Sequence, residues 1–237
     1  MSIKGRSLRW WFVTTVMTSL CARGAEAGSP RLVVELFTSQ GCSSCPPADA
    51  VAGRLAAKPG ILVLSFHVNY WDDLGWKDPF SSAMSTDRQY AYARSLGERS
   101  VFTPQLIVNG TQSLVGSQES AVQRAVAAAS GSSFPIQLDL SRQPDGSFTL
   151  TLNGPDISGE IWEVRYVRHA VTTIRGGENG GRSLETFNNV THLQRIGPFG
   201  ARTINLAPLQ EPENGLAMFV QAPSAGRMLG ATAYPQL

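Results

Sequence analysis

The sequence has few of the residues that most often build catalytic and metal sites. Its 237 residues include three cysteines and three histidines. Charged residues make up only 16% of the chain, and the formal net charge is +2, so no basic surface for nucleic acid or anionic lipid is predicted. The apolar run at residues 10–20 is too short to cross a bilayer, and no longer run follows. The cysteines therefore stand out as the main chemical feature.

The first 27 residues have the pattern of a secretory signal peptide. Basic residues precede the apolar run at 10–20, and the sequence AEA at 25–27 resembles a small-x-small cleavage site. An uncleaved N-terminal anchor is the alternative. The leader holds four of the 20 Lys and Arg residues and one of the 18 Asp and Glu residues, so the mature chain would carry 16 basic and 17 acidic residues. We expect a bacterial periplasmic or secreted protein without a membrane span after cleavage.

Two of the three cysteines lie close together. Cys21 is removed with the leader, so Cys42 and Cys45 can pair only with each other or with a partner molecule. Disulfides persist in the compartments that exported proteins reach. A C-x-x-C sequence between an apolar strand and a helix is an arrangement in which a disulfide can be made and broken repeatedly.

Hydrophobic periodicity predicts alternating strands and helices in residues 28–130. The expected order is β-α-β-α-β-β-α, beginning with a right-handed βαβ unit. The Asn109-Gly110 turn is typical of a hairpin, and Ser117 is the expected N-cap of the last helix. The expected elements are strand 31–37, helix 48–57, strand 61–68, helix 80–96, strands 105–108 and 111–115, and helix 118–129.

A different pattern begins after a linker at residues 130–133. Short apolar segments separated by Gly and Pro turns predict a sandwich-like, mostly-β domain over residues 131–237. Residues 175–182 (RGGENGGR) are expected to form a mobile loop. The expected strands are 136–140, 147–152, 160–174, 184–196, 201–207, 216–221 and 227–233.

Three stretches carry a family resemblance: ELFTSQGCSSCPPAD at 35–49, HVNYWDDLGWKDPF at 67–80 and FTPQLIVNG at 102–110. With the order of elements, they resemble the thioredoxin superfamily over about residues 31–130. More narrowly, nearly the whole mature chain is similar to a family of exported bacterial proteins of unknown function with a thioredoxin-like N-terminal part. The resemblance implies an α/β thioredoxin-like domain followed by the β-rich domain.

The resemblance also implies roles for residues around the C-x-x-C. Cys42 would be an exposed nucleophile and Cys45 a buried resolving thiol. Thr103-Pro104 resembles the cis-proline that faces the cysteines in this superfamily, and a trans proline opening a strand is the alternative. A helix N-terminus lowers the pKa of a nearby thiol. Because the residue before a proline disfavours α geometry, Pro46 predicts that Cys45 is not comfortably helical, which weakens this effect.

Further side chains are expected near the cysteines. The hydroxyls of Ser43 and Ser44 could donate to a Cys42 thiolate. Glu35 lies one residue further from the cysteines than the buried acid of thioredoxins, so it could exchange a proton with Cys45 or be ion-paired instead. Four residues at or after the end of the second strand could form a substrate rim, or could simply pack: His67, Tyr70, Trp71 and Trp76.

These features predict an exported thiol–disulfide oxidoreductase that acts on protein thiols or disulfides and could use a redox partner protein. No cofactor and no metal are expected. One alternative is a thioredoxin-like binding module with a structural or redox-sensing disulfide. A less favoured one is metal delivery, because the spacing fits no standard zinc pattern. Its ligands would be Cys42, Cys45 and His67, with His169 or His192 as the fourth.

Overall fold

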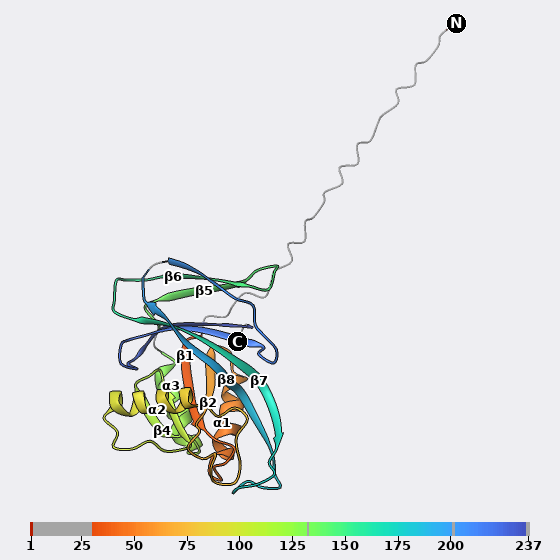
Figure 1. Ribbon diagram of the computed structural model, residues 1–237. Helices are drawn as coiled ribbons and strands as arrows, with labels where there is room; N and C mark the ends of the chain where they lie inside the picture. The colour runs from red at the N-terminus through yellow and green to blue at the C-terminus, as the bar shows by residue number, and fades with distance from the viewer. Residues whose placement is uncertain (2–29, 132, 201, 236–237) are drawn as a thin grey trace.

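The structure is a computed structural model that describes residue 1 and residues 30–131, 133–200 and 202–235 (Figure 1). It is an α/β protein with an eight-stranded mixed sheet in the order β11-β10-β7-β8-β2-β1-β3-β4 and a second sheet in the order β5-β6-β9. Apart from Met1, the signal peptide predicted at 1–27 lies outside the described residues. No helix within the described ranges is long and apolar enough to span a membrane.

The first part of the chain has the predicted order of elements. Ser82 caps α2, because its Oγ accepts a hydrogen bond from the Ser85 amide, so this helix begins later than expected. Ser117 was a wrong prediction for the next N-cap: the cap is Gln118, and its side chain makes no capping bond. The elements are β1 (Leu32–Thr38), α1 (Pro46–Ala56), β2 (Ile61–His67), α2 (Ala83–Leu96), β3 (Gln105–Val108), β4 (Gln112–Val115) and α3 (Glu119–Ala129).

The second part of the chain is built from strands, as predicted. Leu140 and Leu150 of the smaller sheet share a hydrophobic core with Met218 and Leu216 of the larger one, so the two sheets pack face to face. The elements are β5 (Gln137–Arg142), β6 (Phe148–Asn153), β7 (Glu160–Thr173), β8 (Ser183–Pro198), β9 (Arg202–Leu206), β10 (Gly215–Gln221) and β11 (Met228–Tyr234).

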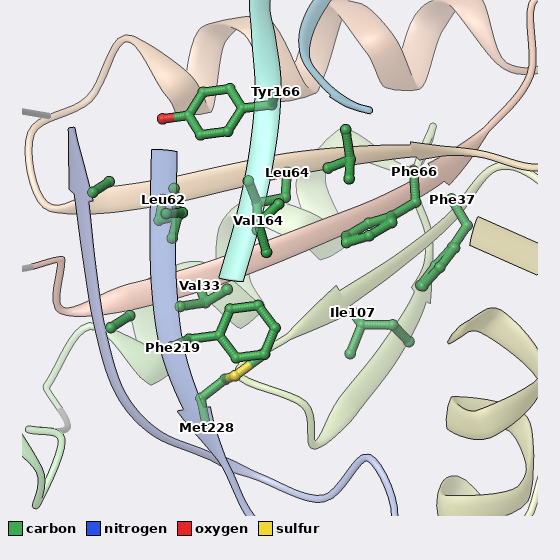
Figure 2. Close-up of a cluster of buried hydrophobic side chains, with 14 of the residues drawn as sticks. Val33, Phe37, Leu62, Leu64, Phe66, Ile107, Val164, Tyr166, Phe219 and Met228 are labelled. Carbon is green, nitrogen blue, oxygen red and sulfur yellow. The ribbon is translucent and has the colours of Figure 1, made fainter. Parts of the chain in front are cut away.

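Strands from both parts of the chain belong to one sheet. Strand β8 lies parallel to β2 and pairs with it at Ser65 and Asn189. A single hydrophobic cluster contains Phe37 and Phe66 together with Phe219 of β10 (Figure 2). The boundary predicted at residues 130–131 therefore remains a prediction from the sequence, whereas in space the two parts share a sheet and a core.

Side chains of β1 alternate between the two faces of the sheet. Val34 and Leu36 share a cluster with residues of α1 and α3. Val33 and Phe37 belong to the cluster on the opposite face, which includes Tyr92 of α2. Because Glu35 has the same parity as Val33 and Phe37, it faces away from the helix that follows the cysteines. Strands β7 and β8 run past this layer to the lower end of the molecule (Figure 1).

Candidate functional site

Cys42 and Cys45 form a disulfide between the end of β1 and the start of α1, with Cα atoms 5.4 Å apart. The Cys45 amide donates to the Cys42 carbonyl over 3.2 Å, which closes a tight turn. This turn holds Cys45 in right-handed helical geometry, with φ −80° and ψ −38°, so the prediction drawn from Pro46 is wrong. Pro46 and Pro47 fit the first turn of α1, where backbone N–H groups need no helical partner.

Both cysteines are fully buried, at 0% exposure, so the expectation of an exposed Cys42 is wrong for this disulfide state. The Ser44 hydroxyl lies 3.3 Å from Cys42 Sγ. The Thr103 hydroxyl lies 3.4 Å from the same sulfur. Ser43 and Ser44 are themselves exposed. The disulfide is thus reached from solvent only past side chains that surround it.

The Thr103–Pro104 peptide bond is cis, which is the geometry that the resemblance implies. Pro104 is buried and Thr103 is partly exposed. The Trp71 indole donates to the Thr103 hydroxyl over 2.9 Å. Thr103 therefore connects an aromatic side chain to the sulfur of Cys42, and these residues form a second wall of the site.

The other three residues predicted for the rim differ in how far they are exposed to solvent. Trp76 is half-buried and donates from its indole to the side chain of Gln40 over 3.2 Å. Tyr70 is exposed and donates to Gln89 on α2. His67 is fully buried, so its place on a rim is a wrong prediction. The reason is its position on β2, a central strand that is covered on both faces.

His67 belongs to a buried ion pair. Its Nδ1 lies 2.6 Å from an Asp78 carboxylate oxygen, and its Nε2 lies 2.9 Å from the side-chain oxygen of Asn189. Burial alone would lower the pKa of His67, but the charge and hydrogen bond of Asp78, the charge of Asp49 and the hydrogen bond to Asn189 together raise this pKa. Both ring nitrogens have partners, so His67 is not free to ligate a metal. Within the described residues, no group of three or more His, Cys, Asp or Glu side chains could hold a metal ion.

Glu35 is also ion-paired. Its carboxylate accepts a hydrogen bond from Arg88 Nε over 2.5 Å and another from the Tyr92 hydroxyl. Arg88 continues the network to Gln221 of β10 and lies over the rings of Phe66, Tyr92, Trp162 and Phe219. Of the two alternatives predicted for Glu35, the structure contains the ion pair. The Glu35 side chain lies on the face of β1 opposite α1.

A different carboxyl group lies on α1, in the helical turn that follows Cys45. Asp49 is buried one helical turn later on α1, and its amide donates to the Cys45 carbonyl. The Thr38 hydroxyl donates to Asp49 over 2.8 Å. Burial raises the pKa of Asp49 to about 6. Asp49 was not predicted from the sequence, although its spacing of four from Cys45 on a helix was a usable signal.

Gln40 connects the cysteine loop to four residues, two in the loop between β2 and α2 and two in the β7–β8 hairpin. Its amide donates to Asp78, and its side chain bonds to Trp76 and to Thr172 of β7. Its carbonyl accepts from the side chain of Asn179 over 3.0 Å. Gln40 is buried, and each of these groups is paired, so the chain is held firmly two residues before Cys42.

The tip of the β7–β8 hairpin, residues 174–182, completes the site. Asn179 is fully buried and donates to the carbonyls of both Gln40 and Cys42, over 3.0 and 2.9 Å. Arg182 donates to the side-chain oxygen of Asn179. Glu178 accepts a hydrogen bond from the Ser43 amide over 3.0 Å. The segment predicted as a mobile loop therefore supplies three contacts to residues 40–43, and no sequence signal pointed to them.

Comparison with known proteins places the chain in a family. The family model described as "Protein of unknown function (DUF1223)" matches residues 33–221. A crystal structure of a protein from Agrobacterium tumefaciens, determined by the Northeast Structural Genomics Consortium, is similar with a TM-score of 0.76 and 28% sequence identity, covering 86% of this chain and 94% of that one. A search of curated proteins gave no significant match. The chain belongs to the DUF1223 family of proteins of unknown function.

Proposed function

We propose that this protein is an exported thiol–disulfide oxidoreductase with a thioredoxin-like N-terminal part. The observation that carries the proposal is the Cys42–Cys45 disulfide at the start of α1, facing a cis proline whose neighbour, Thr103, lies 3.4 Å from Cys42 Sγ. Protein thiols or disulfides in the periplasm or outside the cell are the proposed substrates. A redox partner protein would regenerate the starting state.

The reaction is a two-step exchange of sulfur partners. In the reduced protein, the Cys42 thiolate attacks a substrate disulfide, which forms a mixed disulfide and releases one substrate thiolate. Cys45 loses its proton and attacks Cys42 Sγ, which re-forms the Cys42–Cys45 disulfide and releases the second substrate thiolate. The substrate gains two electrons and the cysteine pair loses them. The reverse sequence oxidises a substrate dithiol.

Asp49 is the proposed acceptor of the Cys45 proton. Its carboxyl group lies on the same side of α1 one turn after Cys45, and its pKa of about 6 leaves it largely ionised at neutral pH. A buried carboxylate with a raised pKa accepts a proton more readily than an exposed one. Glu35 does not take this role in the proposal, because it faces the other side of the sheet and pairs with Arg88.

Substrate reduction tests the proposal. The chain from residue 28 has no cysteine other than the pair, so each thiol can be assigned. We expect the wild type to catalyse reduction of insulin disulfides by dithiothreitol and Cys42→Ser to lose this activity. Cys45→Ser should instead accumulate a mixed disulfide, because its resolving thiol is missing. A wild type without such activity on any protein disulfide would overturn the proposal.

A binding module with a permanently oxidised, structural disulfide is the second candidate. The complete burial of Cys42 favours it, because buried disulfides resist attack by external thiols. Treatment with mild dithiothreitol followed by thiol counting separates the two candidates. Two new thiols in the native protein support the oxidoreductase, and none supports the binding module.

A further inference from the structure

Backbone amides that could stabilise a Cys42 thiolate are scarce in this site. Pro46 and Pro47 have no N–H group, although they occupy the first turn of α1, where free amides normally face an anion. The Cys45 amide donates to the Cys42 carbonyl. The Ser43 amide donates to Glu178. Of the amides between Cys42 and Ala48, only that of Ser44 has no hydrogen bond to another described residue.

Glu178 brings a negative charge to this place. Its side chain is exposed at the tip of the β7–β8 hairpin, and its hydrogen bond from Ser43 lowers its pKa, so it is ionised at neutral pH. Among the described residues, no other charged side chain bonds to residues 42–45. The position is fixed, because the neighbouring Asn179 is buried and binds the Cys42 carbonyl.

The hairpin tip is also packed against the loop that follows β2. A Cβ atom on Gly176 would lie 2.4 Å from the Gly75 carbonyl oxygen, so these two backbones touch. Thr172, just before the tip, accepts a hydrogen bond from Gln40. Glu178 is therefore held beside Ser43 by contacts on both sides of it rather than by its own hydrogen bond alone.

We propose that Glu178 is a positioning residue that biases the Cys42–Cys45 pair toward the disulfide. Its carboxylate accepts the hydrogen bond of the Ser43 amide, so this amide is not available to a Cys42 thiolate. It also places a negative charge next to the residue that follows Cys42. Both effects disfavour a Cys42 thiolate. The inference rests on the proposed redox function. It assigns to the C-terminal half of the chain a direct influence on the chemistry of cysteines in the N-terminal half.

Removal of this one charge tests the inference in the chain from residue 28. Glu178→Gln keeps an oxygen that can accept from Ser43 but removes the negative charge. Glu185→Gln is the matched control, because Glu185 is an exposed acid of the same hairpin that pairs with His169. The Cys42 pKa is measured in the reduced protein from the pH dependence of its alkylation rate. The dithiol–disulfide equilibrium is measured against glutathione.

We expect Glu178→Gln to lower the Cys42 pKa by roughly 0.3 to 0.7 units and to shift the equilibrium about two- to fivefold toward the dithiol, the size typical of one exposed charge pair. Glu185→Gln should change neither value. Glu178→Lys should shift both further in the same direction. High salt should shrink the differences, because it screens an exposed charge.

Two failures are distinguishable. If the wild type exchanges reversibly with glutathione, but Glu178→Gln and Glu178→Lys leave both the Cys42 pKa and the equilibrium unchanged, the inference about Glu178 is overturned and the redox function stands. If the wild-type pair does not exchange with glutathione at all, the proposed function itself is overturned, and the inference with it.

Discussion

At the scale of single residues, the site contains a carboxyl group whose burial disfavours its ionised form. Asp49 is buried, and desolvation raises its pKa from 3.8 to about 6, even though the nearby His67 opposes this shift. The Thr38 hydroxyl donates a hydrogen bond to only one of the two carboxylate oxygens of Asp49. Buried acids with raised pKa values are common where protons are transferred, because a pKa close to the working pH lets the group both accept and donate a proton.

Asp49 should make stability depend on pH. Its folded-state pKa lies above its unfolded value, so its contribution is fully present below pH 3.8 and is lost as the pH rises through about 6. The loss amounts to about 3 kcal/mol at neutral pH. We expect Asp49→Asn to raise the free energy of unfolding relative to wild type more at pH 7.5 than at pH 4.5. Urea titrations at both pH values check this, and an equal difference at both would contradict it.

Glu35 should matter for stability and not for redox chemistry. Glu35→Gln leaves the buried Arg88 without its counter-charge, which typically costs about 3–5 kcal/mol. The double variant Glu35→Gln/Arg88→Met should be less destabilised, because no uncompensated charge remains. We expect the reduction potential of both variants to equal that of wild type. A shifted potential in Glu35→Gln would reinstate this residue as the proton partner of Cys45.

At the scale of helices and strands, local periodicity was sufficient to predict most elements. Each depends on short-range apolar spacing and turn residues such as Asn109-Gly110, which the sequence displays directly. The hairpin tip shows where such reasoning ends. Its glycines suggested mobility, yet Gly176 is required for close contact with Gly75, about 100 residues away in the sequence. The contacts of Glu178 and Asn179 depend on that tertiary approach.

The packing of α1 against β8 yields a prediction for Gly53. An alanine is favoured over glycine within a helix by about 1 kcal/mol. A Cβ atom at position 53 would nevertheless lie 2.4 Å from the Phe187 ring. We expect Gly53→Ala to reduce the free energy of unfolding by about 1–3 kcal/mol. The loss should be smaller in a Phe187→Leu background, and an equal loss in both backgrounds would contradict the contact.

At the scale of the whole molecule, the two parts of the chain are joined through β2 and β8. The sequence indicated a mostly-β second part, and it could not indicate that one of its strands pairs with a strand 120 or so residues earlier. The apolar residues on both faces of β2 predicted that each face is covered, but they did not indicate which elements cover it. Phe66 and Phe219 now share one core, so neither part buries its apolar surface without the other.

This shared core predicts cooperative unfolding of the oxidised chain from residue 28. Trp71 and Trp76 report on the first part, and Trp162 reports on the second. We expect the variant Trp162→Phe and the variant Trp71→Phe/Trp76→Phe each to show a single fluorescence transition that coincides with the loss of circular dichroism. If the fluorescence midpoint of either variant departs from its own dichroism midpoint, the two parts unfold separately.

The reduction potential of the Cys42–Cys45 pair tests the central claim most directly. It is obtained by equilibrating the chain from residue 28 with glutathione buffers and counting free thiols. A working oxidoreductase should show a reversible two-electron transition between about −120 and −270 mV, the range of known thiol–disulfide exchange proteins. A potential below about −300 mV, typical of structural disulfides, would contradict the proposal and leave the pair as a structural feature of the site.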